Sequence, residues 1–217
     1  GTLLGAAAGQ GKNILFEAQL GALRDIDYGI YPFTSSSNTI ASYAPIGAGI
    51  PGCALDNVVG VMKAYSTCVG EGPFVAETAM GEAWNEKLRE SGGEFGAATG
   101  RPRRVGPFDA VASRYGIRCQ KAQDIALTKL DVLGAFDKIP VITGYRLHGV
   151  LLDSFPTDSR LEEAEPVIEE LPGWECDISG CRSWKDLPEN ARKYVCTLEK
   201  LVDHPIYLVS TGAERDA

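Results

Sequence analysis

Short apolar runs alternate along this chain with longer amphipathic segments, and this alternation limits the folds that the chain can adopt. The predicted buried strands are the apolar runs 13–17, 124–128, 140–147 and 205–210. Strands that alternate with helices are typical of α/β proteins built on a largely parallel sheet. The sequence therefore predicts an α/β fold with helices flanking the sheet, in a single domain over residues 1–217.

Apolar residues at helical spacing predict the helices. They fall in 53–66, 79–90, 108–117 and 188–203. The strand 140–147 is expected to pair with 149–152 as an antiparallel excursion from the parallel sheet. The long stretch 20–52 is rich in Gly, Ser, Thr and Pro, and we interpret it as an ordered, ligand-facing loop, because loops of this length are usually functional or disordered.

Composition excludes several classes of function. The net charge is −8, which argues against a nucleic-acid surface, since such a surface needs a face rich in lysine and arginine. No apolar run approaches the roughly 20 residues of a membrane-spanning helix. The six cysteines are scattered without a CxxC pair, so a zinc site is not expected. Neither of the two histidines lies in a nucleophile motif, which disfavours a hydrolase.

The segment GEFGAATGRPRRVGPFD, residues 93–109, concentrates positive charge in an acidic chain. Arg101, Arg103 and Arg104 stand within four residues, in a frame of glycines, a threonine and Pro102. Their mutual repulsion requires an anion to offset it, and guanidinium groups match phosphate or carboxylate in a bidentate manner. The segment predicts an anion site, and the alternative is a solvated basic loop.

Two further motifs follow predicted strands. In TKLDVL (128–133), an Asp after a strand can accept two hydrogen bonds from guanine while a Lys stem covers the base, although Asp131 could equally cap a helix. In LVSTGAERD (208–216), small hydroxyl residues and a glycine would let a flat ring approach the backbone. Both motifs are expected at strand ends, where ligand sites of α/β proteins gather.

Several ordered runs together resemble adenylosuccinate synthetases over almost the whole chain from about Gly11 onward. The runs are ILFEAQLGALRDIDYGIYPFTSSSNT, KAYSTCVGEGPFVAE, GEFGAATGRPRRVGPFD, TKLDVL, PGW and VSTGAERDA. The resemblance implies a GTP-dependent ligase that joins IMP and L-aspartate and releases GDP and phosphate. It further implies an α/β fold distantly similar to the P-loop GTPases, Mg²⁺, a homodimer and a cytoplasmic location in purine biosynthesis.

The resemblance also assigns site residues position by position. For GTP it implies Lys129, Asp131, Arg103, Ser210, Thr211 and Gly212; for IMP, Ser35, Arg101 and Gln19; for aspartate, Val69, Ala98, Thr99, Gly100, Arg101 and Arg103. Ala98 stands where many members have a second threonine, and FEAQLG replaces the usual FEGAQG, which displaces Gln19 by one position.

The family's glycine-rich phosphate loop, of the form GDEGKGK, does not occur in this sequence. In the family this loop and its neighbours supply the general base, the general acid and most of the Mg²⁺ contacts. The resemblance therefore implies that this chain corresponds to a C-terminal portion of the enzyme, without catalytic or metal residues of its own and inactive as a synthetase when alone. The alternatives are a non-catalytic guanine-nucleotide-binding module and a purely structural fragment.

Overall fold

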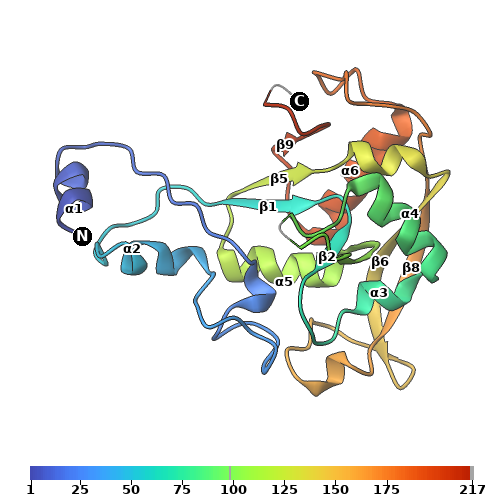
Figure 1. The fold of residues 1–217 in the computed structure, drawn as a ribbon, viewed down its shortest axis with the longest axis horizontal. Helices are drawn as coiled ribbons and strands as arrows, with labels where there is room; N and C mark the ends of the chain where they lie inside the picture. The colour runs from blue at the N-terminus through green and yellow to red at the C-terminus, as the bar shows by residue number, and fades with distance from the viewer. Residues whose placement is uncertain (98, 216–217) are drawn as a thin grey trace.

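The computed structural model describes residues 1–97 and 99–215. At its centre lies a parallel sheet in the order β1-β5-β9 (Figure 1). These strands are β1 (Val59–Lys63), β5 (Asp124–Thr128) and β9 (Leu208–Val209). In β5 the side chains alternate between half-buried and buried, as expected for a strand covered more deeply on one face. The carboxyl ends of the three strands meet at one edge of the sheet.

A second, mixed sheet packs beside the parallel one. Its strands are β4 (Phe108–Asp109), β6 (Lys138–Leu147), β7 (Val150–Leu151) and β8 (Glu165–Pro172). β6 runs parallel to β4 and antiparallel to β7 and β8, with an irregularity in the β8 pairing between Ile142 and Gly144. A separate antiparallel pair joins β2 (Ser66–Cys68) to β3 (Arg104–Gly106). The fold is thus α/β, with a parallel sheet and an antiparallel excursion, as the sequence predicts.

Six α-helices and four short 3-10 turns are found in the described part of the chain. The α-helices are α1 (Thr2–Gly9), α2 (Ala44–Gly47), α3 (Val75–Ala79), α4 (Glu82–Gly92), α5 (Ala110–Gln120) and α6 (Glu189–Val202). The turns are η1 (Ala22–Arg24), η2 (Ala41–Tyr43), η3 (Asp131–Ala135) and η4 (Ser159–Leu161). None of these helices has the length and apolar character needed to cross a bilayer.

The core lies between the sheets and the helices that cover them. One buried cluster joins the strand residue Leu127 to Tyr194 and Leu198 of α6, and a second surrounds Tyr145 and Phe155. Tyr194 donates a hydrogen bond of 2.6 Å to the carbonyl oxygen of Ala64, which fixes α6 against the end of β1. Apolar side chains on one face of α6 drive this packing, because their burial removes apolar surface from water.

The helices predicted at 79–90, 108–117 and 188–203 are confirmed, as are the strands 124–128 and 140–147 with the hairpin to 149–152. Of the strand predicted at 205–210, only β9 (Leu208–Val209) forms in the structure. The stretch 20–52 is largely irregular apart from η1, η2 and α2, as expected.

Two predictions were wrong. The segment 53–66 is not a helix but contains β1, since its β-branched valines suit a strand paired with β5. Residues 13–17 form no strand, because no described strand lies beside them to take their backbone hydrogen bonds. Leu15 in this segment is 95% exposed. The acidic strand β8 was not predicted at all.

Candidate functional site

The polar residues predicted after β5 and β9 lie side by side. The backbone N–H of Ser210 donates to the carbonyl oxygen of Leu127 at 2.8 Å, which extends the β5–β9 pairing by one residue. Lys129 and Asp131 follow the end of β5. In a parallel sheet the strand ends form a crevice in which α/β proteins bind ligands.

Lys129 connects this edge to helix α4. Its backbone is left-handed, with a φ of 63°, and its Nζ atom donates a 2.8 Å hydrogen bond to the carbonyl oxygen of Gly92. Gly92 ends α4, directly before the arginine-rich segment 93–109. The lysine contact therefore places the start of that segment beside the end of β5. A lysine at the C-terminus of a helix also interacts favourably with the helix dipole.

Asp131 opens the turn η3 and carries an oxygen without a hydrogen-bond partner. Its Oδ1 atom is buried, and no residue among 1–97 and 99–215 donates to it. Its side chain also does not cap η3, which argues against the capping alternative. A buried polar atom left unpaired in a native structure requires a cause, and a ligand that supplies the missing donor is one.

The segment after β9 is held in place by two hydroxyl groups. Thr211 is 4% exposed, and its Oγ1 atom donates to the carbonyl oxygen of Cys181 at 3.2 Å. The Ser210 hydroxyl donates to the carbonyl oxygen of Gly212 at 3.0 Å, which closes a tight turn. The backbone at this strand end is therefore fixed before any ligand arrives.

The arginine-rich segment forms a compact hairpin. Phe95 and Pro102 make an isolated antiparallel bridge, and the Gly96 N–H donates to the Arg101 carbonyl oxygen at 2.8 Å. Gly100 has a φ of 63°, a left-handed conformation that favours glycine, at the tip of this hairpin. Thr99 and Arg101 are exposed there. Ala98 lies outside the described residues.

A buried glutamate, Glu94, anchors the base of the hairpin. It is 1% exposed; Oε2 accepts from Arg103 Nη1 at 2.8 Å, and Oε1 accepts from Lys63 Nζ at 2.7 Å and Tyr65 Oη at 2.6 Å. Burial alone would raise the pKa of Glu94, but the hydrogen bonds from Lys63 and Tyr65 lower it below its usual value. Glu94 is therefore ionised at neutral pH and orients Arg103.

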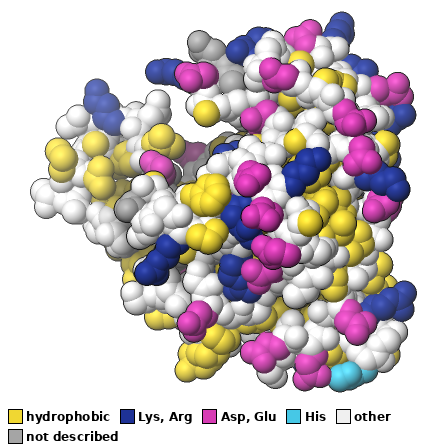
Figure 2. All heavy atoms as spheres, turned by 45° about the vertical axis from the view of Figure 1, so that its right-hand side comes forward, with side chains coloured by type: hydrophobic (Ala, Val, Ile, Leu, Met, Phe, Trp, Pro, Cys, Tyr) yellow, Lys and Arg dark blue, Asp and Glu magenta, His cyan; other side chains and the backbone are white. Residues whose placement is uncertain are grey.

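This network corrects the prediction that the three arginines jointly require an external anion. Arg103 pairs with Glu94, and Arg104 pairs with Glu77 through an Nη2–Oε2 contact of 2.6 Å. The hydrogen bond to Glu77 raises the pKa of Arg104. Within the described part of the chain no ion pair involves Arg101, which is exposed, so the predicted anion site and the alternative of a solvated basic loop both now concern this residue. Charges of both signs are interleaved over the face shown in Figure 2.

Sequence reasoning did not identify Glu94, Lys63 or Tyr65. A glutamate beside two glycines gives no signal of burial. Lys63 and Tyr65 are distant from Glu94 along the chain and reach it only because β1 ends beside α4.

The predicted residues Ser35 and Val69 lie in two loops joined by Arg24. The Arg24 guanidinium donates to the carbonyl oxygens of Phe33, Glu71 at 2.9 Å and Val69 at 3.0 Å. The Arg24 carbonyl oxygen accepts from the Ser35 N–H at 2.8 Å. Val69 follows β2, whose partner β3 begins at Arg104, so both loops lie near the base of the arginine hairpin.

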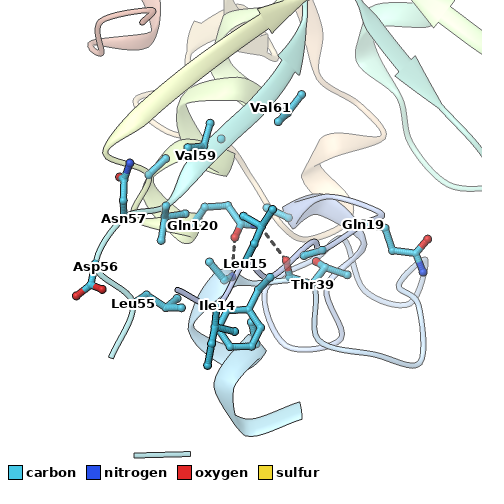
Figure 3. A pocket seen from close by; sticks show the side chains of 18 of the residues that line it. Ile14, Leu15, Gln19, Thr39, Leu55, Asp56, Asn57, Val59, Val61 and Gln120 are labelled. Atoms are coloured by element: carbon cyan, nitrogen blue, oxygen red, sulfur yellow. Dashed lines mark hydrogen bonds between the residues drawn. The ribbon is translucent and has the colours of Figure 1, made fainter. Parts of the chain in front are cut away.

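Gln19 is placed differently from the other predicted residues. It is exposed and lines a cavity of about 910 Å³ between the extended segment 14–22, strand β1 and helix α5 (Figure 3). The lining of this cavity includes none of the other residues predicted to bind GTP, IMP or aspartate.

No group of three or more His, Cys, Asp or Glu side chains that could hold a metal ion occurs in residues 1–97 and 99–215. Asp131 and Glu94 do not make such a group, because Glu94 is already bound by three side chains of the protein. The described residues therefore offer no ready-made cage of protein ligands for Mg²⁺, an ion that proteins commonly hold with one or two carboxylates together with phosphate oxygens.

The parallel sheet, with polar groups gathered at its carboxyl edge, places the chain among the α/β proteins, whose ligand sites commonly lie at such an edge. A sequence model described as adenylosuccinate synthetase matches residues 1–217. The chain belongs to the adenylosuccinate synthetase family.

Curated relatives agree with this assignment. The adenylosuccinate synthetase of Trichlorobacter lovleyi is 51% identical over 99% of this chain, and that of Pelobacter propionicus is 50% identical over 95%. The structure of fully ligated adenylosuccinate synthetase from Plasmodium falciparum has a TM-score of 0.93 at 37% identity and covers 99% of this chain. This chain covers 51% of that structure and 50% and 48% of the two relatives. It thus spans about half the length of the proteins that it matches.

Proposed function

We propose that this chain supplies guanine recognition and the aspartate- and IMP-binding arginine hairpin of a synthetase that forms adenylosuccinate from IMP and L-aspartate. In that reaction the γ-phosphoryl group of GTP passes to O6 of IMP, and the aspartate amine then displaces the phosphate at C6. The products are adenylosuccinate, GDP and phosphate. Family membership supports the ligase class, and the roles of individual residues are those that the resemblance implies, with geometry in support at Asp131 and in the arginine hairpin.

The buried, unpaired Oδ1 of Asp131 carries the guanine assignment. The ring N–H and the exocyclic amino group of guanine offer two donors in the geometry that one carboxylate accepts. Adenine presents an acceptor where guanine has its ring N–H, so Asp131 would select guanine. Lys129, whose amine is held by Gly92, lies two residues away. The turn at Ser210, Thr211 and Gly212 adjoins the same strand end.

The arginine hairpin would hold the dicarboxylate substrate and position it for attack. Arg101 is free of described ion pairs and can take a carboxylate in a bidentate manner, and Thr99 offers a hydroxyl. The Gly100 N–H donates to the Gly96 carbonyl oxygen at 2.7 Å, so Gly100 would hold the turn that presents these two side chains. Arg103, oriented by Glu94, would offset charge near the transferred phosphate. Such positioning and charge neutralisation is the protein's main contribution to phosphoryl transfer.

Ser35 and Val69 would complete the substrate site from the two loops that Arg24 joins, and Gln19 would contact IMP from the extended segment. Mg²⁺ and a second subunit belong to the proposed enzyme as a whole, and no step of the reaction is assigned to a metal on this chain.

Calorimetric titration with GDP and ADP tests the guanine assignment. We expect the 217-residue chain to bind GDP in preference to ADP, and Asp131→Asn to weaken GDP binding about tenfold or more, because an amide offers one acceptor and one unwanted donor. The matched control is Asp137→Asn, which removes an exposed carboxylate near the end of η3. Equal GDP affinity in wild type and Asp131→Asn would refute the assignment.

A further inference from the structure

Arg24 is bound by the backbone of two loops. Its Nη2 atom donates to the carbonyl oxygen of Val69 at 3.0 Å, and its Nη1 atom donates to that of Glu71 at 2.9 Å. Nη1 also donates to the carbonyl oxygen of Phe33, in the loop that carries Ser35. In the described part of the chain no ion pair involves Arg24. Its guanidinium therefore fixes loop backbone and neutralises no carboxylate there.

Arg104 binds the alternate carbonyl oxygens of the same loop, residues 69–72. Its Nη1 atom donates to Gly70 at 3.1 Å and to Gly72 at 2.9 Å. Its Nε and Nη2 atoms donate to Oε2 of Glu77 on α3 at 2.8 and 2.6 Å, which orients the guanidinium. All four carbonyl oxygens of the loop thus accept from a charged donor, and such hydrogen bonds are about twice as strong as neutral ones.

The loop 69–72 has little else to fix its backbone. Gly70 and Gly72 have φ values of 88° and 102°, and the loop belongs to no helix or strand. Glycine loses more conformational freedom on folding than any other residue. Val69, Gly70 and Glu71 are all exposed, so burial contributes little to their order. The hydrogen bonds from the two arginines are therefore the principal polar restraint on this backbone.

The two loops that Arg24 joins are also in direct contact. A Cβ atom on Gly72 would lie 2.5 Å from the Cγ atom of Phe33, so the loops pack without room for a side chain at this position. The Arg24 carbonyl oxygen accepts from the Ser35 N–H at 2.8 Å. One residue thus holds the first loop by its carbonyl oxygen and its side chain, and the second loop by its side chain.

We propose that Arg24 is a positioning residue for the substrate side of the site. With Arg104, it orders the loops 33–35 and 69–72 as one unit before the substrates arrive, so that binding does not bear the entropy cost of ordering them. This inference rests on the proposed function, because it takes IMP and aspartate as the ligands of these loops through Ser35 and Val69.

The role requires the planar fork of arginine and not its charge alone. Nη1 contacts Phe33 and Glu71, while Nη2 contacts Val69 and the Sγ atom of Cys68 at 2.8 Å. The single ammonium group of a lysine cannot reproduce two donor atoms at a fixed separation. Arg24→Lys therefore separates the contribution of the fork from that of the positive charge.

Nitrogen-15 relaxation of the 217-residue chain tests the ordering. We expect backbone order parameters of about 0.85 over residues 33–35 and 70–72 in the wild type, and below about 0.6 in Arg24→Met and in Arg24→Lys. Circular dichroism checks that each variant keeps the fold. The matched control is Arg118→Met, which removes an exposed arginine from the last turn of α5 and should leave both loops ordered.

Titration with IMP and with L-aspartate, followed by chemical shifts, tests the role in binding. We expect both affinities to fall about tenfold in Arg24→Met and Arg24→Lys, because ordering of the loops would then oppose binding. The affinity for GDP should stay within about twofold of the wild type, since the residues proposed to bind GTP lie outside these loops. Arg118→Met should bind all three ligands as the wild type does.

Four outcomes would overturn the proposal. The first is an unchanged order parameter in both loops of Arg24→Met. The second is full recovery of order and affinity in Arg24→Lys, which would assign the effect to charge. The third is an equal loss of GDP affinity, which would indicate general damage to the fold. The fourth is IMP and aspartate binding that Arg24→Met leaves unchanged.

Failure of the proposed function gives a different result. A wild-type chain that binds neither IMP nor L-aspartate would refute the assignment of these loops to the substrates, and the role of Arg24 would fall with it. Measurable binding in the wild type, unaffected by Arg24→Met, would refute the role of Arg24 alone.

Discussion

Asp109 is expected to make the stability of this protein decrease as the pH rises toward neutrality. Its carboxylate is 4% exposed at the start of α5, where Oδ1 accepts from the backbone N–H groups of Val111 and Ala112, both at 3.0 Å. The buried hydroxyl of Tyr145 donates to Oδ2. Among residues 1–97 and 99–215 no ion pair to Asp109 is found, and Arg114 acts on the carboxyl only through its charge. Burial raises the pKa of Asp109 from 3.8 to about 6, although these hydrogen bonds oppose the rise.

The sign and size of the effect follow from linkage. Because the folded state binds the proton more tightly than the unfolded state, the contribution to stability is complete below pH 3.8 and is lost as the pH rises through about 6. A rise of roughly two pKa units corresponds to about 3 kcal/mol in the free energy of unfolding. In Asp109→Asn the amide oxygen can still accept from Val111 and Ala112, and the side chain carries no charge at any pH.

Urea unfolding of wild type and Asp109→Asn between pH 4 and pH 7.5 measures this effect. We expect the difference in unfolding free energy, variant minus wild type, to rise by about 2.5 kcal/mol in favour of the variant across this range, since part of the effect is already lost at pH 4. Comparison of the two proteins cancels the titration of the other acidic groups. Asp137→Asn, at an exposed position, serves as the control. A difference that stays constant within about 0.5 kcal/mol would refute the reasoning.

Two further predictions concern the packing around the arginine hairpin. Glu94→Gln should lower the unfolding free energy, measured in urea at pH 7, by about 3 kcal/mol. This is the low end of the range for breaking a buried ion pair, because Lys63 and Arg103 keep partial hydration. A loss below about 1 kcal/mol would contradict this. Gly106→Ala should cost about 3 kcal/mol or more by thermal unfolding, since its Cβ would lie 2.1 Å from the Ala76 carbonyl oxygen. Gly180→Ala, with open space around it, should be neutral, and equal losses in both would argue against the steric cause.

Strands and helices with strong local patterns could be predicted from the sequence. In β5 and α6 the apolar residues recur with the spacing of a strand and of a helix, respectively. The packing of these two elements in the fold agrees with this local preference. β1 was predicted as a helix because its apolar residues also fit helical spacing. The pairing with β5, more than 60 positions along the chain, decides in favour of the strand. β8 was missed because its many glutamates conceal Val167 and Leu171, which are partly buried against the rest of the sheet.

The candidate site was predictable where a motif follows a strand, and not where contacts bridge distant segments. Lys129 and Ser210 could be placed at one sheet edge because parallel strands end together. The charge balance of Arg103 and Arg104 could not be foreseen. Glu77 lies on helix α3, and Glu94, although it is in the same hairpin as Arg103, gives no sequence signal that it is buried. The roles of these residues toward GTP, IMP and aspartate stay predictions.

The unpaired oxygen of Asp131 has a cost in the free protein. An acceptor buried without a donor lowers the stability of the fold by about 1–3 kcal/mol. Because Oδ1 is already shielded from water once the chain has folded, an incoming donor does not have to strip water from this oxygen. If Asp131 has the proposed role, selection for a robust fold and selection for tight nucleotide binding act in opposite directions on this residue, and a side chain that relieved the deficit would strengthen the protein while weakening the binding.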